Sequence, residues 1–292
     1  MAKTIGLVGA SGWLGQKVAE KLRDRGDEVV GFSRSERSGN GISWRQWDGK
    51  SLPDVSGLDA LINLAGEPIF QRWNEKVKKR LRDSRVDLSA KLAEAVRGSE
   101  VSVFLNASAV GIYGDRGDEV LTEESGKGDG YLADLTADWE DVVTAKGDLG
   151  ARVAFLRTGI VLGKDGGAWE TMAPIFKTGI GGKLGDGQQF MPWIHLEDEV
   201  NAIIFLLDQE VSGPVNLTAP EPVRNETFTK EVGDALGRPT WIPAPKFGLK
   251  LALGEFAEEG LLASQRVVPR VLEREGFEFR FPGLRGALGD LV

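Results

Sequence analysis

The sequence predicts an α/β fold with a doubly wound parallel sheet and a smaller, mainly helical C-terminal substrate lobe. Two observations lead to this prediction. A first apolar strand, residues 4–8, runs directly into the glycine-rich turn 9–15. Short apolar runs then alternate with segments whose apolar residues recur at helical spacing. Strands that alternate with helices typically form a parallel sheet that is covered on both faces.

The first half of the chain supplies most of the predicted sheet. After the strand 4–8, Trp13, Leu14, Val18, Ala19 and Leu22 follow a helical period until Gly26. Further strands are expected at 28–32, 42–47, 59–64, 101–107 and 152–156, because these segments are short and apolar. Helical spacing predicts one long helix over 74–96 and another over 132–143.

The composition of the sequence changes after Gly163, where glycine-rich and proline-containing segments precede a more helical C-terminal third. Residues 1–163 are expected to form the nucleotide-binding domain, to which a helix at 197–208 and a strand at 214–217 return within the segment 196–220. Residues 164–195 and 221–292 are expected to form the substrate lobe. The alternation of Phe277, Phe279 and Phe281 with charged residues predicts a half-buried strand that Pro282 ends.

The composition excludes several classes of protein. In 292 residues, 36 Lys and Arg stand against 44 Asp and Glu, so the formal net charge is −8, which argues against a nucleic-acid partner. The absence of cysteine excludes disulfides, thiolate nucleophiles and Cys-ligated metals, and no metal site is expected. The longest apolar run, 202–207, is far too short for a membrane span. Because no leader pattern opens the chain, a cytoplasmic protein is expected, with a small-molecule substrate and an undecided oligomeric state.

The turn 9–15 reads GASGWLG, and it has the context of a dinucleotide-binding loop. Gly9 permits the tight turn, Gly12 lets backbone N–H groups approach a pyrophosphate, and Gly15 allows the helix to pack closely on the sheet. Ser11, Trp13 and Leu14 complete the predicted loop. A tight strand–helix turn without a ligand is the alternative. The strand, loop and helix together predict a Rossmann fold.

The end of the second strand indicates which dinucleotide binds. An acidic side chain about 20 residues after the loop would hold the ribose 2′-hydroxyl of NAD. This chain has Ser33 and Arg34 there instead, and a guanidinium suits a 2′-phosphate. The sequence therefore predicts NADP(H) over NAD(H), the alternative being that Arg34 is a solvated loop residue. Two later strand ends complete the predicted cofactor site, with Asp48 at the adenine and Leu64, Ala65 and Gly66 at the ribose and pyrophosphate.

Beyond the glycine loop, the chain resembles the extended short-chain dehydrogenase/reductases. It is similar to a nucleoside-diphosphate-sugar epimerase-like branch that carries a small C-terminal domain. The matching stretches cover nearly the whole chain and read GASGWLG, NLAGEPIFQRW, SRVDLSAKL, NASAVGIYG, LRTGIVLGKDGG, GQQFMPWIHLEDE and SQRVVPRVLEREGFEF. The resemblance implies NADP(H)-dependent epimerase, dehydratase or reductase chemistry.

The chain departs from this family at the catalytic residues. The resemblance implies a Tyr and a Lys four residues later on one helix, with a Ser or Thr at the end of the fifth strand. The two tyrosines, Tyr113 and Tyr131, are followed four residues later by Gly117 and Leu135, so no such pair exists. Alignment on the helix that carries Trp139 places Leu132 in the tyrosine slot and Thr136 in the lysine slot, and Ala109 takes the Ser/Thr position.

Several residues are candidates for the missing chemistry, each with a structural alternative. Ser108 and Tyr113 follow the fifth strand and could handle a proton, although strand-end aromatics commonly pack. Arg85 stands where relatives commonly have Asn, and it could bind a substrate anion or pair with Asp83 or Asp87. Segment 179–189, with Lys183 and Gln189, is predicted to be a flexible flap over the substrate or an ordinary surface loop. His195 could bind substrate or form hydrogen bonds within the fold.

Two hypotheses follow for the function. The first is an NADP(H)-binding oxidoreductase or epimerase-like protein that acts on a small polar carbonyl, hydroxyl or sugar-like substrate. The second is a non-catalytic NADP(H)-sensing or interaction module. The absence of the Tyr–Lys pair favours the second hypothesis, and the complete substrate-side lobe favours the first. Segment 115–130 has six acidic residues and two basic ones. This charge argues against a nucleotide-sugar substrate, because the acidic residues would repel a second nucleotide.

Overall fold

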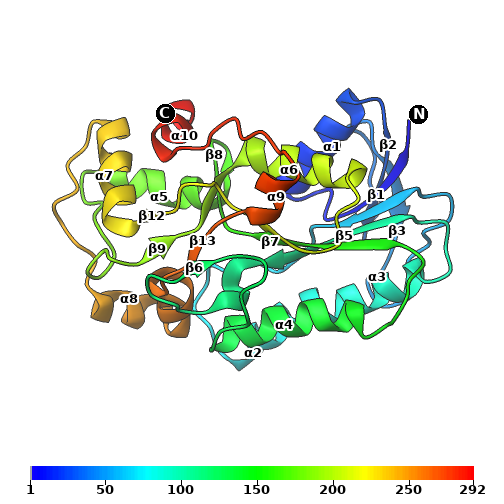
Figure 1. The fold of residues 1–292 in the computed structure, drawn as a ribbon, viewed down its shortest axis with the longest axis horizontal. Helices are drawn as coiled ribbons and strands as arrows, with labels where there is room; N and C mark the ends of the chain where they lie inside the picture. The colour runs from blue at the N-terminus through cyan, green and yellow to red at the C-terminus, as the bar shows by residue number, and fades with distance from the viewer. Residues whose placement is uncertain (1) are drawn as a thin grey trace.

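The computed structural model describes residues 2–292 and is built around one seven-stranded parallel sheet (Figure 1). The strand order is β11-β7-β5-β4-β1-β2-β3. Its members are β1 (Thr4–Val8), β2 (Glu28–Ser33), β3 (Ser43–Gln46), β4 (Ala60–Asn63), β5 (Val103–Ala109), β7 (Arg152–Thr158) and β11 (Gly213–Leu217). The order reverses at β1, which pairs with both β2 and β4. The predicted doubly wound Rossmann sheet is confirmed, and its reversal point is where such sheets bind ligands.

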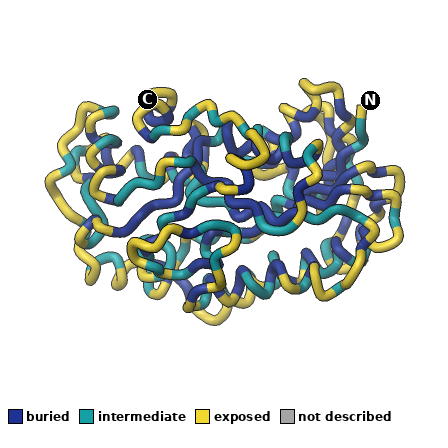
Figure 2. Tube along the Cα trace, viewed as in Figure 1, coloured by how far each residue is buried: buried dark blue, intermediate teal, exposed yellow. Residues whose placement is uncertain are grey.

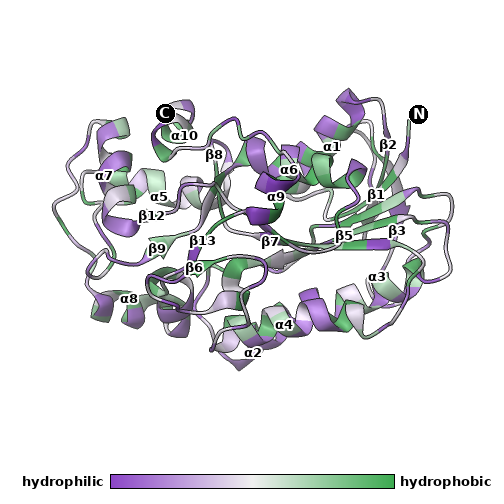
Figure 3. Ribbon diagram, viewed as in Figure 1, coloured by the Kyte–Doolittle hydropathy of each residue, from purple (hydrophilic) through white to green (hydrophobic). Residues whose placement is uncertain are grey.

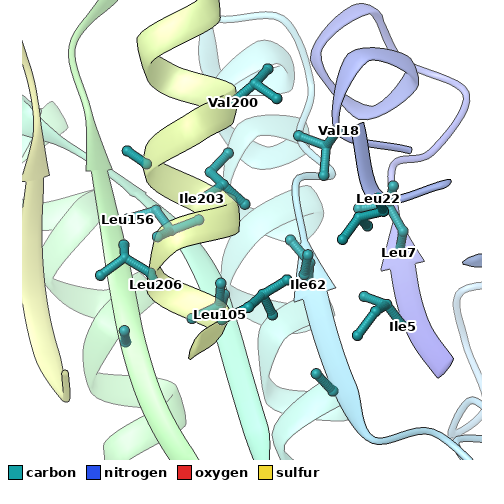
Figure 4. Packing of buried hydrophobic residues seen from close by; sticks show 14 of the residues in the cluster. Ile5, Leu7, Val18, Leu22, Ile62, Leu105, Leu156, Val200, Ile203 and Leu206 are labelled. Carbon is teal, nitrogen blue, oxygen red and sulfur yellow. The ribbon is translucent and has the colours of Figure 1, made fainter. Parts of the chain in front are cut away.

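Helices cover both faces of this sheet. The first face is covered by α1 (Trp13–Asp24) and α6 (Leu196–Asp208), and Figure 4 shows their apolar side chains meeting those of the central strands. On the other face lie α3 (Leu88–Val96) and α4 (Tyr131–Thr144). The strands between these two layers are buried in Figure 2 and mainly hydrophobic in Figure 3. The core therefore holds the carboxyl ends of the strands in fixed positions, where a ligand would bind.

The helix predicted over 74–96 forms in three parts. Asn74 begins it, because its side chain accepts a hydrogen bond from the Val77 N–H at 3.0 Å. Then α2 (Glu75–Arg82), a π-helical segment η1 (Asp83–Asp87) and α3 follow without a break. Hydrophobic periodicity does not reveal a π-helical segment, which adds one residue to a turn. Such segments are frequent at functional sites.

The second lobe is mainly helical, as predicted. Its helices are α5 (Gly167–Lys177), α7 (Asn225–Leu236), α8 (Lys246–Leu253), η3 (Ala257–Leu262), α9 (Arg270–Arg274) and α10 (Leu284–Leu291). A hydrophobic cluster joins α5, α7 and α10. Two pairs of short strands link this lobe to the sheet domain, β8 (Ile160–Gly163) with β10 (Trp193–His195) and β6 (Val120–Leu121) with β13 (Arg266–Val267), and a third pair, β9 (Phe190–Met191) with β12 (Val223–Arg224), forms within the lobe. A 3₁₀ turn, η2 (Val110–Tyr113), follows β5.

The strand predicted over 277–281 is wrong, because this segment pairs with no strand in the described residues. It instead lies extended along α6. The ring of Phe277 meets that of Phe205 at 5.4 Å, and the backbone N–H groups of Arg280 and Phe281 donate to the carboxylate of Asp198 at 2.8 and 2.9 Å. Alternating aromatic residues are equally suited to an extended segment that packs on a helix.

Among residues 2–292, no helix combines the length and apolar character that a membrane crossing requires.

Candidate active site at the carboxyl ends of the strands

The glycine loop has the geometry that each of its glycines predicts. Gly9 has a φ of +89°, and a Cβ atom there would lie 2.9 Å from the backbone N of Ala65. A Cβ atom on Gly15 would lie 2.1 Å from the carbonyl oxygen of Gly9. Only glycine therefore allows α1 to sit directly on the loop. The same contacts bring the β1 loop against the turn after β4.

The N-terminus of α1 is free to bind an anion. Its N-cap, Gly12, has no side chain, and no acidic residue lies in the first turn. The N–H of Gly12 itself donates to the Gly9 carbonyl at 2.9 Å, whereas Trp13 and Leu14 have the unpaired N–H groups of a first helical turn. These groups and the helix dipole together suit a pyrophosphate. The residues present therefore fit a dinucleotide.

Trp13 fixes the loop to the second lobe. Its ring lies against three glycines at the β8–α5 turn, and Cβ atoms on Gly163 or Gly166 would come within 2.4 to 2.5 Å of that ring. Its indole nitrogen is buried without a hydrogen-bond partner. Sequence reasoning placed Trp13 in the cofactor loop, and the structure adds this packing contact.

The residues after β2 and β3 are those predicted to bind the adenosine end of a dinucleotide. Arg34 is exposed and has no ion-pair partner among residues 2–292, and Arg37 donates to the Ser33 hydroxyl at 3.1 Å. Asp48 accepts hydrogen bonds from the Ser51 and Lys50 backbones and from the Ser51 hydroxyl, which lower its pKa to about 2. One of its oxygens, Oδ1, accepts all three bonds. Arg34 and Arg37 place positive charge beside Ser33, which suits a phosphate.

A buried polar network holds the turn that contains Leu64, Ala65 and Gly66. The Asn63 side chain accepts from the Ala65 N–H at 3.1 Å and donates to Asn106 at 2.8 Å. Ser89 also bonds Asn106, at 3.0 Å, and accepts from the Trp139 indole at 2.8 Å. These bonds tie β4, β5, α3 and α4 together where ligands would bind.

The two helix positions that correspond to the family's catalytic Tyr and Lys hold side chains that pack against a neighbouring turn. Leu132 and Thr136 both face Gly111, whose Cβ position lies 3.4 Å from Cβ of Leu132 and 3.6 Å from the Thr136 hydroxyl. Thr136 is buried. Neither residue can supply the proton transfer of a Tyr–Lys pair, and Tyr131 does not replace it, because its hydroxyl donates to the Lys78 carbonyl at 2.9 Å.

Ser108 and Tyr113 do not face a ligand space, so the structure gives no support to their predicted catalytic roles. Both are buried, and their hydroxyls belong to one network. Ser108 donates to Glu140 at 2.5 Å, and Glu140 accepts two 2.8 Å bonds from Arg157. Arg157 donates to the Tyr113 hydroxyl at 3.0 Å, which itself donates to Asn216 at 2.7 Å. Burial raises the pKa of Tyr113 above its ordinary value, despite the Arg157 charge.

Two further substrate candidates have mainly structural contacts. Gln189 is buried and donates to the Leu184 and Leu261 carbonyls, both at 3.2 Å. His195 is buried against Phe281, and its Nδ1 accepts from the Glu197 N–H at 3.2 Å, so it caps α6, which favours the structural alternative. Burial lowers the pKa of His195. Neither side chain is therefore placed to bind a substrate.

The predicted flap is tied down along its length. The Lys183 carbonyl accepts from the Ala244 N–H at 2.8 Å, and the N–H of Gly185 donates to the Ala244 carbonyl at 2.9 Å. At its end, the N–H of Asn225 donates to the Gln189 carbonyl. These backbone bonds favour an ordered surface loop over a freely moving flap. The Lys183 side chain is half-buried against Gly187.

A cavity of about 180 Å³ opens beside Leu132, at the N-terminus of α4. Four acidic residues line it, namely Asp115, Asp129, Glu258 and Glu259. Glu259 comes from the second lobe and accepts from the Leu132 N–H at 2.7 Å, which caps α4, because the N-cap Gly130 has no side chain. The cavity's charge suits hydroxyl groups better than phosphates. No cluster of metal-binding side chains occurs within residues 2–292.

Arg85 lies between the turn after β4 and α4. Its Nη2 donates to the Glu67 carbonyl at 3.0 Å, and its guanidinium lies 5.2 Å from the centroid of the Trp139 ring. The predicted alternative, an ion pair with Asp83 or Asp87, does not form, and Asp83 pairs with Lys79 instead. Among residues 2–292, Arg85 has no ion-pair partner, and it lies beside the turn after β4 where the cofactor is expected.

Sequence reasoning missed Glu140, Arg157 and Glu199. Burial raises the pKa of Glu199 to about 8, and within residues 2–292 its carboxylate accepts one hydrogen bond, from the Thr158 hydroxyl at 2.8 Å. Glu140 could have been suspected, because it falls on the apolar face of its helix beside Trp139 and Val143. The sequence gives no indication that Glu199 is buried, since acidic residues are ordinary in the first turn of a helix.

Comparison with known proteins agrees with this geometry. Residues 5–218 match the NAD dependent epimerase/dehydratase family, and residues 244–291 match a domain of unknown function, DUF1731. Epimerase family protein Mb2239 of Mycobacterium bovis is 42% identical over 289 residues, which cover 98% of this chain and 96% of the relative.

Solved structures are similar over the same length. The crystal structure of human epimerase family protein SDR39U1 (isoform 2) with NADPH has a TM-score of 0.92 and 32% identity, covering 99% of this chain and 98% of that one. UDP-N-acetylglucosamine 4-epimerase of Bacillus cereus, at 18% identity and a TM-score of 0.79 over 99% and 98% of the two chains, shares the fold. The chain therefore belongs to the NAD dependent epimerase/dehydratase family, in a branch that carries the DUF1731 domain.

Proposed function

We propose that this protein binds NADP(H) in preference to NAD(H) and uses it in oxidoreductase or epimerase-like chemistry on a small polar substrate. One observation carries the cofactor preference. The second strand ends in Ser33 and an unpaired Arg34 instead of a carboxylate, next to a glycine loop that fits a pyrophosphate. The NADPH in the structure of the human relative supports the same preference.

Replacement of Arg34 by alanine tests this preference. Because the variant loses a charge-assisted contact to the 2′-phosphate, we expect its affinity for NADPH to fall about 10- to 100-fold, while its affinity for NADH stays unchanged. Fluorescence titration with both coenzymes measures this. Equal affinities of the unaltered protein for NADPH and NADH would remove the argument for Arg34.

The proposed substrate is a carbonyl or hydroxyl compound, or a sugar-like molecule, without a nucleotide. When bound, the cofactor would supply or accept a hydride. Ser108 and Tyr113 are committed to the buried network, so the proton would come from water at the cleft. The acidic cavity beside Leu132 would receive substrate hydroxyls, and its charge disfavours the second diphosphate of a nucleotide sugar.

A second candidate function is a non-catalytic NADP(H) sensor. The packing of Leu132 and Thr136 against Gly111 favours it, because no side chain in the family's catalytic slots can transfer a proton. On this hypothesis the nucleotide pocket would be retained and turnover would be absent.

NADPH oxidation against a panel of small carbonyl compounds separates the two functions. For the enzyme we expect turnover of at least one compound. We also expect Ser108→Ala and Tyr113→Phe to keep the rate within about threefold and to lower the melting temperature, because each leaves a buried partner unpaired. Tight NADPH binding without any turnover would favour the sensor. A large rate loss in Tyr113→Phe at unchanged stability would restore that residue's catalytic role.

A further inference from the structure

Arg85 is held in place by backbone and hydroxyl groups and not by a carboxylate. Its Nη2 donates to the Glu67 carbonyl at 3.0 Å, and its Nη1 contacts the Leu81 carbonyl and the Ser84 hydroxyl at 3.4 Å. Within residues 2–292, its Nε–H donates no hydrogen bond, and the atom is not among those buried without a partner. The guanidinium therefore keeps a free donor that solvent or a ligand can reach.

Four neighbouring cations of the same helical stretch are each paired with a carboxylate. Lys78 pairs with Glu255, Lys79 with Asp83, Arg80 with Glu67 and Arg82 with Asp138. Arg85 has no carboxylate within 4 Å among the described residues. Burial lowers the pKa of Arg85 to about 10, so the side chain remains charged at neutral pH. An unpaired, largely desolvated cation is costly to a fold unless an anion joins it.

The position of this charge points to the ligand site. The guanidinium lies 3.3 Å from the Cβ position of Gly66, in the turn after β4 that contacts the glycine loop of β1. The guanidinium also lies over the ring of Trp139, which is two helical turns beyond Leu132 on the same side of α4. The π-helical segment η1 carries Arg85 to this place. An anion here would lie beside a bound dinucleotide.

A single guanidinium favours an anion with a single negative charge. Arg85 is one cation, and the cavity at the N-terminus of α4 is lined by four acidic side chains. A dianionic phosphate or a diphosphate would meet that repulsion without a second cation. A carboxylate would match the single guanidinium through paired hydrogen bonds.

We propose that Arg85 binds the carboxylate of the substrate, so that the substrate class is a carbonyl or hydroxy acid. This inference rests on the proposed function, because it takes the reaction site to be the one beside the nicotinamide. It makes Arg85 a specificity-determining residue of the proposed site.

Calorimetric titration of the NADP⁺-loaded protein tests the inference without turnover, because the oxidised cofactor cannot reduce a ketone. The probes are pyruvate and benzoylformate, each compared with its methyl ester. We expect each acid that binds to bind at least tenfold more tightly than its ester. In Arg85→Gln, the affinity for the acid should fall about 10- to 100-fold, because a charge-assisted bond is lost. Arg85→Lys should recover part of that loss.

Three controls make the outcome interpretable. Arg82→Gln, one turn earlier and paired with Asp138, should leave all affinities unchanged. Melting temperatures show that each variant is folded. NADPH is titrated separately, and the acids are also titrated without nucleotide. A failure of NADPH to bind would refute the proposed function, while an Arg85-dependent preference for the acid over the ester would still support the anion site.

Several results would overturn the inference. Acids and esters could bind equally, or neither acid could bind the loaded protein. Methyl phosphate could bind in an Arg85-dependent manner where the carboxylates do not. NADPH affinity could fall in Arg85→Gln as much as acid affinity, in which case Arg85 would bind the cofactor and not the substrate.

Discussion

The Arg157→Met variant is expected to lose about 3 to 5 kcal/mol of its free energy of unfolding, which is a large part of the stability of an ordinary domain. Arg157 and Glu140 are both buried and joined by two 2.8 Å hydrogen bonds. Removal of the arginine leaves the Glu140 carboxylate in the interior without its counter-charge. Burial alone would lower the pKa of Arg157, but the bonds with Glu140 hold it above its ordinary value.

Urea unfolding of three variants measures this effect. The matched control is Arg82→Met, whose partner Asp138 is exposed, and it should change the free energy of unfolding by less than about 1 kcal/mol. The double variant Arg157→Met with Glu140→Leu should recover part of the loss, because no unpaired charge remains buried. Equal losses of unfolding free energy in Arg157→Met and Arg82→Met would show that the buried ion pair stabilises the fold no more than the exposed one.

This network also explains why the sequence misled about Ser108 and Tyr113. Ser108 lies at the end of β5, one residue before the family's Ser/Thr position, and Tyr113 lies in the turn that follows, and this placement can be predicted from the motif around Gly111. Their partners lie 32 and 103 residues further along the chain, at Glu140 and Asn216. No local pattern links such distant residues. A hydroxyl's role here depends on which element packs over it.

The fold and the cofactor loop were predictable because their signals are local. Gly9 and Gly15 are required by contacts within the strand–loop–helix unit, and the sheet order follows from alternating strands and helices. The π-helical segment η1 was not predicted, because apolar residues spaced three and four positions apart indicate a helix without marking the turn that gains a residue. For the same reason, the contact between Arg85 and Gly66 was not predicted from the sequence.

The second large effect concerns Glu199, which is fully buried on α6. Burial raises its pKa from 4.5 to about 8, and the hydrogen bond from Thr158 only partly opposes this. Between these two values the folded chain holds a proton that the unfolded chain has released. The contribution of this group to stability is therefore fully present below pH 4.5 and is lost as the pH rises towards 8. The slope is about 1.4 kcal/mol per pH unit.

Glu199→Gln removes this titration while keeping the shape of the side chain. The variant should gain stability relative to the unaltered protein as the pH rises, and the difference should change by several kcal/mol between pH 5 and pH 8. Urea unfolding over that range measures it. Glu197→Gln on the same helix turn, whose partner Arg280 is exposed, is the control for the loss of a carboxylate at the start of α6. Because Asp198 and His195 titrate in both proteins, their contributions cancel in the difference, and a flat Glu199→Gln profile would mean that the carboxyl is already ionised in the fold.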